Sequence, residues 1–219
     1  MHVRTTTSVL LALALVACGG ERRAGEDAFA DRADTALATD STGARRAGVA
    51  ADSTRPRRDT ATVRVEVDVT ARQLRVIGAA GDTVALHPVA VGSPEWPTRT
   101  GTWTIDQVVL NPEWIPPDES WAAEREPRKP GDPKNPLGRA QLVYDMPRTV
   151  HGTNDPASIG KAVSHGSIRV TNTSAIALAE LLLQRTGVDD VRGRLERARR
   201  DSTEKQIIDL PMTVPIRVF

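Results

Sequence analysis

The sequence predicts a mostly β fold with one or two short helices. Hydrophobic residues make up 39% of the 219 residues, but aromatic residues make up only 3%. The core must therefore rest on Val, Ile and Leu, which suit strands. Short runs of alternating apolar and polar residues follow one another with short turns between them, as in all-β proteins. Apolar residues at helical spacing occur only in two late segments.

The predicted strands begin just after residue 62. Val63, Val65, Val67 and Val69 alternate with polar residues, which predicts a half-buried strand. Further runs, bounded by Gly, Pro and Asp turns, predict strands at residues 73–78, 84–92, 101–110, 140–146, 149–153 and 206–219.

Two other kinds of segment interrupt the strands. Residues 111–138 are rich in Pro and lack periodicity, which predicts a long ordered loop or lid; such loops are usually functional. Residues 173–187 predict a helix with an Ile and Leu face, capped by Thr173 or Ser174 and ended by Gly187. Residues 189–200 predict a second helix with a basic outer face.

The N-terminal third has a different composition. Residues 1–18 contain a short apolar run that ends in Leu-Val-Ala-Cys and resembles a signal peptide with the lipobox of bacterial lipoproteins, with Cys18 as the lipidated residue. Residues 19–62 show no apolar periodicity and predict a disordered tether. We therefore expect residues 63–219 to form the folded domain, held at the membrane through Cys18 on the periplasmic side of the cell envelope.

The overall charge excludes one class of partner. The chain carries 29 Lys and Arg residues against 28 Asp and Glu residues. Nucleic-acid binding relies on a positive charge excess that meets phosphates, so we expect no nucleic-acid partner.

Residues 151–169 contain the groups that acyl transfer requires, namely a nucleophile, a base and oxyanion donors. His151 is the candidate base for a nucleophile at Ser167, and the backbone amides of Gly166 and Ser167 are candidate oxyanion donors. His165 would shape the loop or contact the substrate. Arg169 would either support the loop or pair with a substrate carboxylate.

The run HGTNDPASIGKAVSHGSIRV resembles the signature of the YkuD-type L,D-transpeptidase family (ErfK/YbiS/YcfS/YnhG-like). The flanking PTRTGTWTI, NPEWIPP and NPLGRA runs also resemble blocks of that family. The matching positions of the signature are His151, Gly152, Thr153, Gly160, Ser164, His165, Gly166, Ile168 and Arg169. Thr153 and Ser164 thereby join the candidate residues that bind substrate or shape the loop.

This resemblance implies a YkuD-type β-sandwich that acts on peptidoglycan stem peptides ending in a diamino acid followed by D-Ala. Such enzymes cleave that bond through an acyl-enzyme and pass the acyl group to an amine, making a 3→3 crosslink or attaching a protein to the cell wall. They use no cofactor and no metal, and none is expected here.

One position departs from the family pattern, because Ser167 stands where the family has its nucleophilic Cys. A Ser hydroxyl usually needs a His oriented by a carboxylate, and Asp145 or Asp155 could serve if the fold brought one close. Three hypotheses follow: an enzyme that uses Ser167, a peptidoglycan-binding envelope lipoprotein without turnover, or a Cys enzyme whose nucleophile has been replaced. The chemistry favours L,D-transpeptidase-like acyl transfer that is impaired by Ser167.

Overall fold

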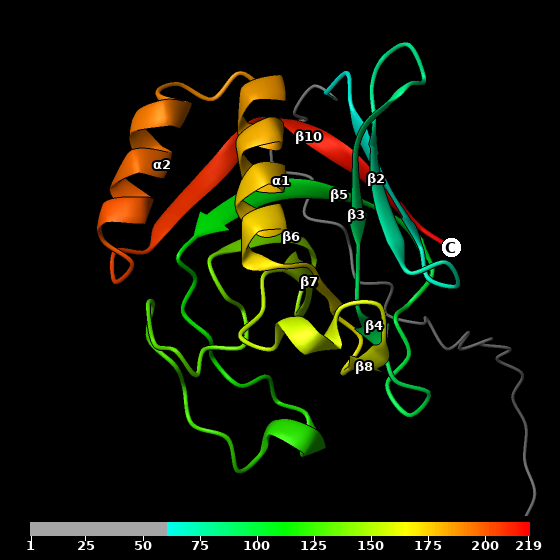
Figure 1. Cartoon of the computed structure of the whole chain (residues 1–219), viewed down its shortest axis with the longest axis vertical. Coiled ribbons are helices and arrows are strands. Elements are labelled where there is room, and N and C mark those ends of the chain that lie inside the picture. Colours follow the sequence, from blue (N-terminus) through cyan, green and yellow to red (C-terminus); the bar gives the residue numbers. More distant parts are fainter. Residues whose placement is uncertain (1–60) are drawn as a thin grey trace, which may run out of the picture. The chain divides into compact units, whose positions relative to one another are not determined.

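The computed structural model describes residues 61–219 (Figure 1). The predicted signal peptide, Cys18 and almost all of the predicted tether lie outside these residues. The described residues form ten strands, two α-helices and two short 3₁₀ helices. The strands are β1 (Arg64–Asp68), β2 (Gln73–Ile77), β3 (Thr83–Pro88), β4 (Val91–Gly92), β5 (Gly101–Leu110), β6 (Ala140–Asp145), β7 (Arg148–His151), β8 (Ala162–Ser164), β9 (Ile168–Arg169) and β10 (Gln206–Val218). The helices are η1 (Ser120–Ala122), η2 (Pro156–Ser158), α1 (Asn172–Arg185) and α2 (Val191–Arg200).

Eight of the strands form one curled sheet in the order β3-β2-β1-β10-β5-β6-β7-β9. The pairs β1–β10 and β7–β9 are parallel, and the other pairs are antiparallel. β10, the last strand in the sequence, lies between β1 and β5, so the C-terminal segment is a central part of the sheet. β4 and β8 form a separate parallel pair. The mostly β fold with two helices is confirmed.

The strand predicted at residues 84–92 is divided in the structure. β3 ends at Pro88, and β4 begins at Val91 and pairs with β8. Proline has no backbone N–H to donate, so it favours the end of a ladder over its middle. The break carries the chain from the large sheet to the β4–β8 pair, beside residues 164–169.

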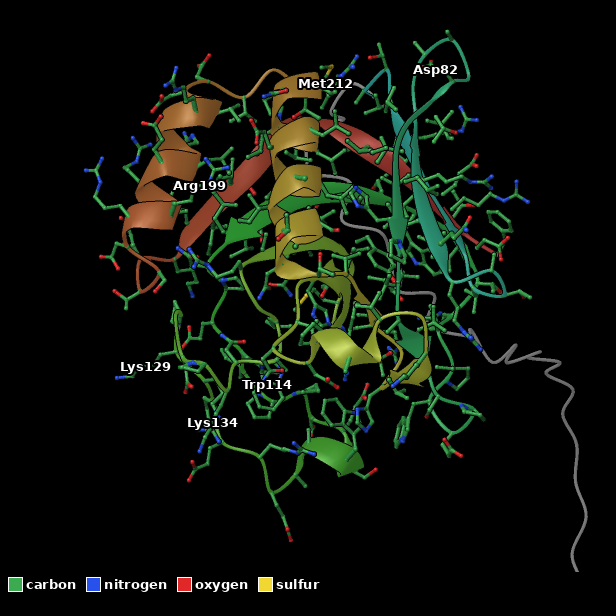
Figure 2. The ribbon with its side chains drawn as sticks, in the orientation of Figure 1. Asp82, Trp114, Lys129, Lys134, Arg199 and Met212 are labelled. Atoms are coloured by element: carbon green, nitrogen blue, oxygen red, sulfur yellow. The ribbon has the colours of Figure 1, made fainter. Side chains whose placement is uncertain are left out.

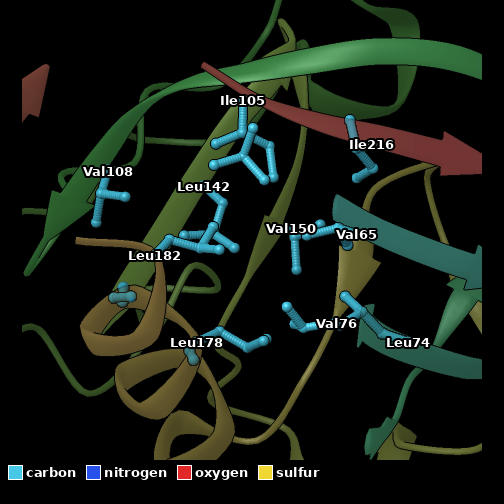
Figure 3. Close-up of a cluster of buried hydrophobic side chains, with 14 of the residues drawn as sticks. Val65, Leu74, Val76, Ile105, Val108, Leu142, Val150, Leu178, Leu182 and Ile216 are labelled. Atoms are coloured by element: carbon cyan, nitrogen blue, oxygen red, sulfur yellow. The ribbon is translucent and has the colours of Figure 1, made fainter. Parts of the chain in front are cut away.

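The core lies between the curled sheet and α1 (Figure 3). Val65 and Val76 come from the β1–β2 end of the sheet, and Val150 comes from the β7 end; all three belong to one cluster of buried side chains. Leu178 and Leu182 of α1 are fully buried in the same cluster. The core therefore consists mainly of Val, Ile and Leu side chains, and it packs against β7 and β9.

Both helices begin at a side chain that accepts a backbone hydrogen bond. The N-cap of α1 is Thr171, whose hydroxyl oxygen accepts from the Ser174 amide at 3.1 Å, so the predicted caps Thr173 and Ser174 were wrong. The reason is local: Thr171 has extended backbone dihedrals and stands at the entry to the first turn. Asp190 caps α2 in the same way, through the Gly193 amide.

The Thr171 cap leads to a test of stability. We expect Thr171→Ala to lower the free energy of unfolding by about 1 kcal/mol, because it leaves the Ser174 amide without its acceptor. Thr173→Ala, in the same first turn but without a cap role, should change it by less than about 0.5 kcal/mol. Urea unfolding followed by circular dichroism measures both values, and equal losses in the two variants would contradict the assignment of the cap.

Residues 111–138 form the long loop that the sequence predicts, and they are held by buried amide side chains. Asn135 donates to the carbonyls of Pro112 and Lys129 at 2.8 and 3.2 Å. Asn111 donates to the carbonyls of Ala198 and Asp201 at 3.0 Å each. These bonds fix both ends of the loop. Figure 2 shows the loop extending from the sheet, with the side chain of Lys129 pointing away from the domain.

Candidate functional site

A cleft of about 1030 Å³ lies between residues 111–138 and the ends of β7, β8 and β9. Five of the predicted site residues line it: His151, Ser164, His165, Ser167 and Arg169. They come from three segments that meet at the cleft. β7 carries His151, β8 ends at Ser164, and β9 pairs in parallel with β7 so that Arg169 lies beside His151.

His151 is buried at the wall of the cleft, with 5% of its surface exposed. Its Nδ1 lies 2.6 Å from the carbonyl oxygen of Gly152. A carbonyl can only accept, so Nδ1 carries the proton and Nε2 keeps its lone pair. The pKa of His151 is lowered from its usual 6.5 to about 4, mainly by burial; the bond to Gly152 opposes this shift, and the charge of Arg169 adds to it. The imidazole is therefore neutral at pH 7.

The loop between β8 and β9 presents Ser167. Its hydroxyl oxygen accepts a hydrogen bond from the backbone amide of Thr149 on β7, at 3.3 Å. The Ser164 hydroxyl donates to the Ser167 carbonyl at 2.6 Å and so closes the loop. Gly166 has φ +95°, in the left-handed region that favours glycine. These contacts place the Ser167 hydroxyl at the edge of β7, two residues along from His151.

Neither predicted carboxylate orients His151. Asp145 pairs with Arg99 at 3.1 Å, and its side chain lies at the turn between β6 and β7. Asp155 follows the β7 strand, and its charge acts on the Arg169 guanidinium. The partner of Nδ1 is the Gly152 carbonyl instead. The sequence pattern could not show this, because any residue at position 152 supplies the same carbonyl.

Three further predicted residues have distinct positions. Thr153 does not line the cleft; its hydroxyl accepts from the Asp155 amide at 3.0 Å, which shapes the turn after His151. Gly166 also lies outside the lining, between His165 and Ser167, which line it. Arg169 exchanges backbone hydrogen bonds with Ala90 at 2.8 and 2.9 Å, while its side chain lines the cleft. Burial lowers the pKa of its guanidinium, and the charge of Asp155 opposes this shift.

His165 connects the Ser167 loop with the long loop. Its ring stacks on Trp121 with centroids 3.9 Å apart and 10° between the planes, and Trp96 lies 5.9 Å away on a tilted plane. Trp121 also stacks with Trp114 at 6.5 Å. Burial lowers the pKa of His165. Because its ring contacts residues 111–138 directly, His165 fixes the loop that carries Ser167 against the cleft's opposite wall.

Sequence reasoning missed several residues that line the cleft. Arg148 begins β7, and Glu119 and Trp121 belong to the long loop. The Trp121 indole N–H donates to Glu119 Oε2 at 2.7 Å. Glu119 Oε1 pairs with Arg148 at 3.3 Å. The Pro-rich composition indicated a functional loop, but no pattern indicated which of its residues would face His151.

Residues 61–219 lack two kinds of feature. No group of three or more His, Cys, Asp or Glu residues is placed to hold a metal ion there. In the same range, no helix has the length and apolar character needed to cross a membrane.

Parallel strands of a mostly β domain thus bring a buried His and a candidate nucleophile to one cleft. These features define the class of protein. The family model YkuD, described as the L,D-transpeptidase catalytic domain, matches residues 62–191. The chain therefore belongs to the YkuD family of L,D-transpeptidase domains.

The chain is also similar to individual proteins. A putative L,D-transpeptidase YkuD of Bacillus licheniformis is 31% identical over 131 residues, covering 59% of this chain and 66% of that protein. The probable L,D-transpeptidase YbiS of Escherichia coli is 32% identical over 99 residues, covering 42% of this chain and 32% of that protein. The solved L,D-transpeptidase from Mycobacterium smegmatis has a TM-score of 0.48 and 18% identity, covering 73% of this chain and 59% of that one. The chain thus spans about one to two thirds of these proteins' lengths.

Proposed function

We propose that the protein catalyses L,D-transpeptidase-like acyl transfer on peptidoglycan stem peptides, with Ser167 as the nucleophile. The observation that carries this proposal is the meeting of two segments at one cleft: β7, which carries His151, and the loop that enters the parallel strand β9, which carries Ser167. The bond from Nδ1 to the Gly152 carbonyl leaves Nε2 of His151 as the basic nitrogen. The family supports the substrate class, since its members are named L,D-transpeptidases.

In the proposed reaction, the Ser167 hydroxyl oxygen attacks the carbonyl between the diamino acid and D-Ala. His151 Nε2 takes the hydroxyl proton, and the backbone amides of Gly166 and Ser167 face the oxyanion. The C–N bond then breaks, and the amine of D-Ala leaves with the proton from His151. An acceptor amine attacks the resulting ester, loses its proton to His151, and regenerates the Ser167 hydroxyl.

Three features make this reaction slower than one with a Cys nucleophile. A hydroxyl is much less acidic than a thiol, so little of it is ionised at neutral pH. Burial and the charge of Arg169 both disfavour the imidazolium that proton transfer would create on His151, as its lowered pKa indicates. The group at Nδ1 is a neutral carbonyl, which stabilises an imidazolium less than a carboxylate does.

A second function remains a candidate, namely an envelope protein that binds peptidoglycan without turning it over. The same three features favour it, and the cleft exists independently of the nucleophile's chemistry. Retention on isolated cell-wall sacculi that is unaffected by His151→Ala, together with no acyl-enzyme, would support this second function.

The proposal includes a location and a domain organisation. Residues 63–219 would form the peptidoglycan-acting domain, and residues 19–62 would tether it to a lipid on Cys18 at the periplasmic side of the envelope. The composition of these segments supports this, and the tether would let the cleft reach the cell wall.

The experiment that separates the two functions is acylation by a carbapenem followed by mass spectrometry. We expect the wild-type chain to gain the mass of the opened carbapenem on the proteolytic peptide that contains Ser167, and Ser167→Ala to lose this gain. Ser174→Ala is the matched control, because Ser174 is a serine hydrogen bonded to a His, at 3.0 Å from His87 Nδ1, that lies away from the cleft. An unmodified wild-type chain would exclude acyl transfer through Ser167.

A further inference from the structure

Arg148 is a cationic side chain at the cleft that the proposed reaction does not use. It begins β7, three residues before His151, and it is one of the residues that line the cleft, together with His165 and Ser167. About a quarter of its side chain is exposed, at 24%. It is therefore neither a surface arginine nor part of the apolar core.

The guanidinium is only partly satisfied by the protein. Its Nη2 lies 3.3 Å from Glu119 Oε1, longer than the roughly 2.7–2.9 Å of a strong charge-assisted hydrogen bond. Its Nε is buried and has no hydrogen-bond partner, the one such side-chain atom found within residues 61–219. Buried donors are nearly always paired, so an unpaired donor at a cleft indicates a missing acceptor.

The two donors lie on the same edge of the guanidinium. A carboxylate can accept from Nε and Nη2 together, in the planar two-bond geometry that arginine offers and lysine does not. Glu119 uses only one of these two donors. Because Glu119 is itself a carboxylate on the long loop, it occupies part of a position that a ligand carboxylate would fill completely.

The unpaired donor also lies beside the nucleophile loop. A Cβ placed on Gly166 would stand 3.1 Å from Arg148 Nε, so the glycine at this position leaves room for the guanidinium. The next residue of β7, Thr149, donates to the Ser167 hydroxyl oxygen at 3.3 Å. In a peptide that ends in D-Ala, the terminal carboxylate is separated from the reacting carbonyl only by the D-Ala nitrogen and Cα. A group that binds this carboxylate must therefore lie next to the nucleophile, as Arg148 does.

We propose that Arg148 binds the terminal carboxylate of the stem peptide, replacing Glu119 at the Nε and Nη2 edge. This inference rests on the proposed function and extends it to specificity: the cleft would select peptides with a single residue after the bond to be broken. A ligand carboxylate that displaces Glu119 would also release the contact between Arg148 and the long loop, so binding and loop movement would be coupled.

The test compares two stem tetrapeptides that differ only at the end, one with a free D-Ala carboxylate and one with a D-Ala amide. Binding is measured by calorimetry to the full chain carrying Ser167→Ala, which removes the nucleophile. We expect the acid to bind about tenfold or more tightly than the amide, the usual range for a hydrogen-bonded charge. Arg148→Gln should abolish this preference, and Arg148→Lys should reduce it, because Lys keeps the charge but loses the two-donor edge.

Two further variants separate ligand binding from an indirect effect through the loop. Glu119→Gln removes the competing carboxylate and should keep or increase the preference for the acid. Arg99→Gln, which breaks the pair with Asp145 outside the cleft, should leave the preference unchanged.

The outcomes distinguish this inference from the proposed function. Three results would overturn the role of Arg148 but not the proposed function. They are equal binding of acid and amide to the Ser167→Ala chain, a preference that survives Arg148→Gln, and a preference lost equally in Glu119→Gln. If neither peptide binds, the proposed function fails and this inference fails with it. The comparison of the two peptides on the same chain needs no Arg148 variant, so it holds even if Arg148→Gln does not fold.

Discussion

Replacing Ser167 with Cys is expected to raise the rate of acyl transfer by roughly a hundredfold or more. A thiol has a pKa near 8.5, so a few per cent of it is ionised at pH 7. The neutral His151 can take its proton, and the resulting thiolate offsets the unfavourable imidazolium inside the buried site. The Thr149 amide, which donates to the Ser167 hydroxyl oxygen, is placed to face the thiolate as well.

The rate is measured as D-Ala released and crosslinked dimer formed from tetrapeptide muropeptides, quantified by mass spectrometry. The matched control is the same Cys variant carrying His151→Gln, which can retain a hydrogen bond to the Gly152 carbonyl but has no basic nitrogen. We expect this control to lose most of the gain. A folded Ser167→Cys chain with no more activity than Ser167→Ala would show that the cleft does not support acyl transfer with either nucleophile.

The fold could be predicted because its signals are local. The alternation of Val63, Val65 and Val67 and the leucine face of residues 173–187 each follow from burial on one side of a strand or helix. What the sequence could not provide was pairing between distant segments. Nothing in residues 206–219 indicates that β10 lies between β1 and β5, since such pairing depends on the whole sheet.

The candidate site could be predicted to the level of residue types but not of contacts. The motif identified His151 and Ser167, which the structure brings to one cleft. It could not identify the Gly152 carbonyl as the partner of Nδ1, because a backbone atom leaves no trace in residue identity. The motif also could not identify Arg148. The contact of Arg148 with Glu119 joins residues 29 positions apart and depends on how residues 111–138 fold back over the cleft.

The burial of His151 should make the folded state sensitive to acid. An exposed imidazole in the unfolded chain has a pKa near 6.5, whereas in the folded chain the pKa of His151 is about 4. Between these two values the unfolded chain binds more protons than the folded chain, so a fall in pH favours unfolding. The contribution of His151 is fully present above pH 6.5 and is lost as the pH falls towards 4. The shift corresponds to about 3 kcal/mol of unfolding free energy.

Carboxylates and the other histidines also titrate in this range, so the informative quantity is a difference between variants. Urea unfolding at several pH values between 7 and 4 gives the free energy for the wild type and for His151→Gln. We expect the wild type to lose about 3 kcal/mol more than the variant over this range. His165→Gln is the control. Burial lowers the pKa of His165 too, but the ring of His165 lies against Trp121 at the cleft and is less buried than that of His151. If His151→Gln and the wild type show the same pH dependence, then the pKa of His151 is the same in the folded and unfolded chains, and burial does not lower it.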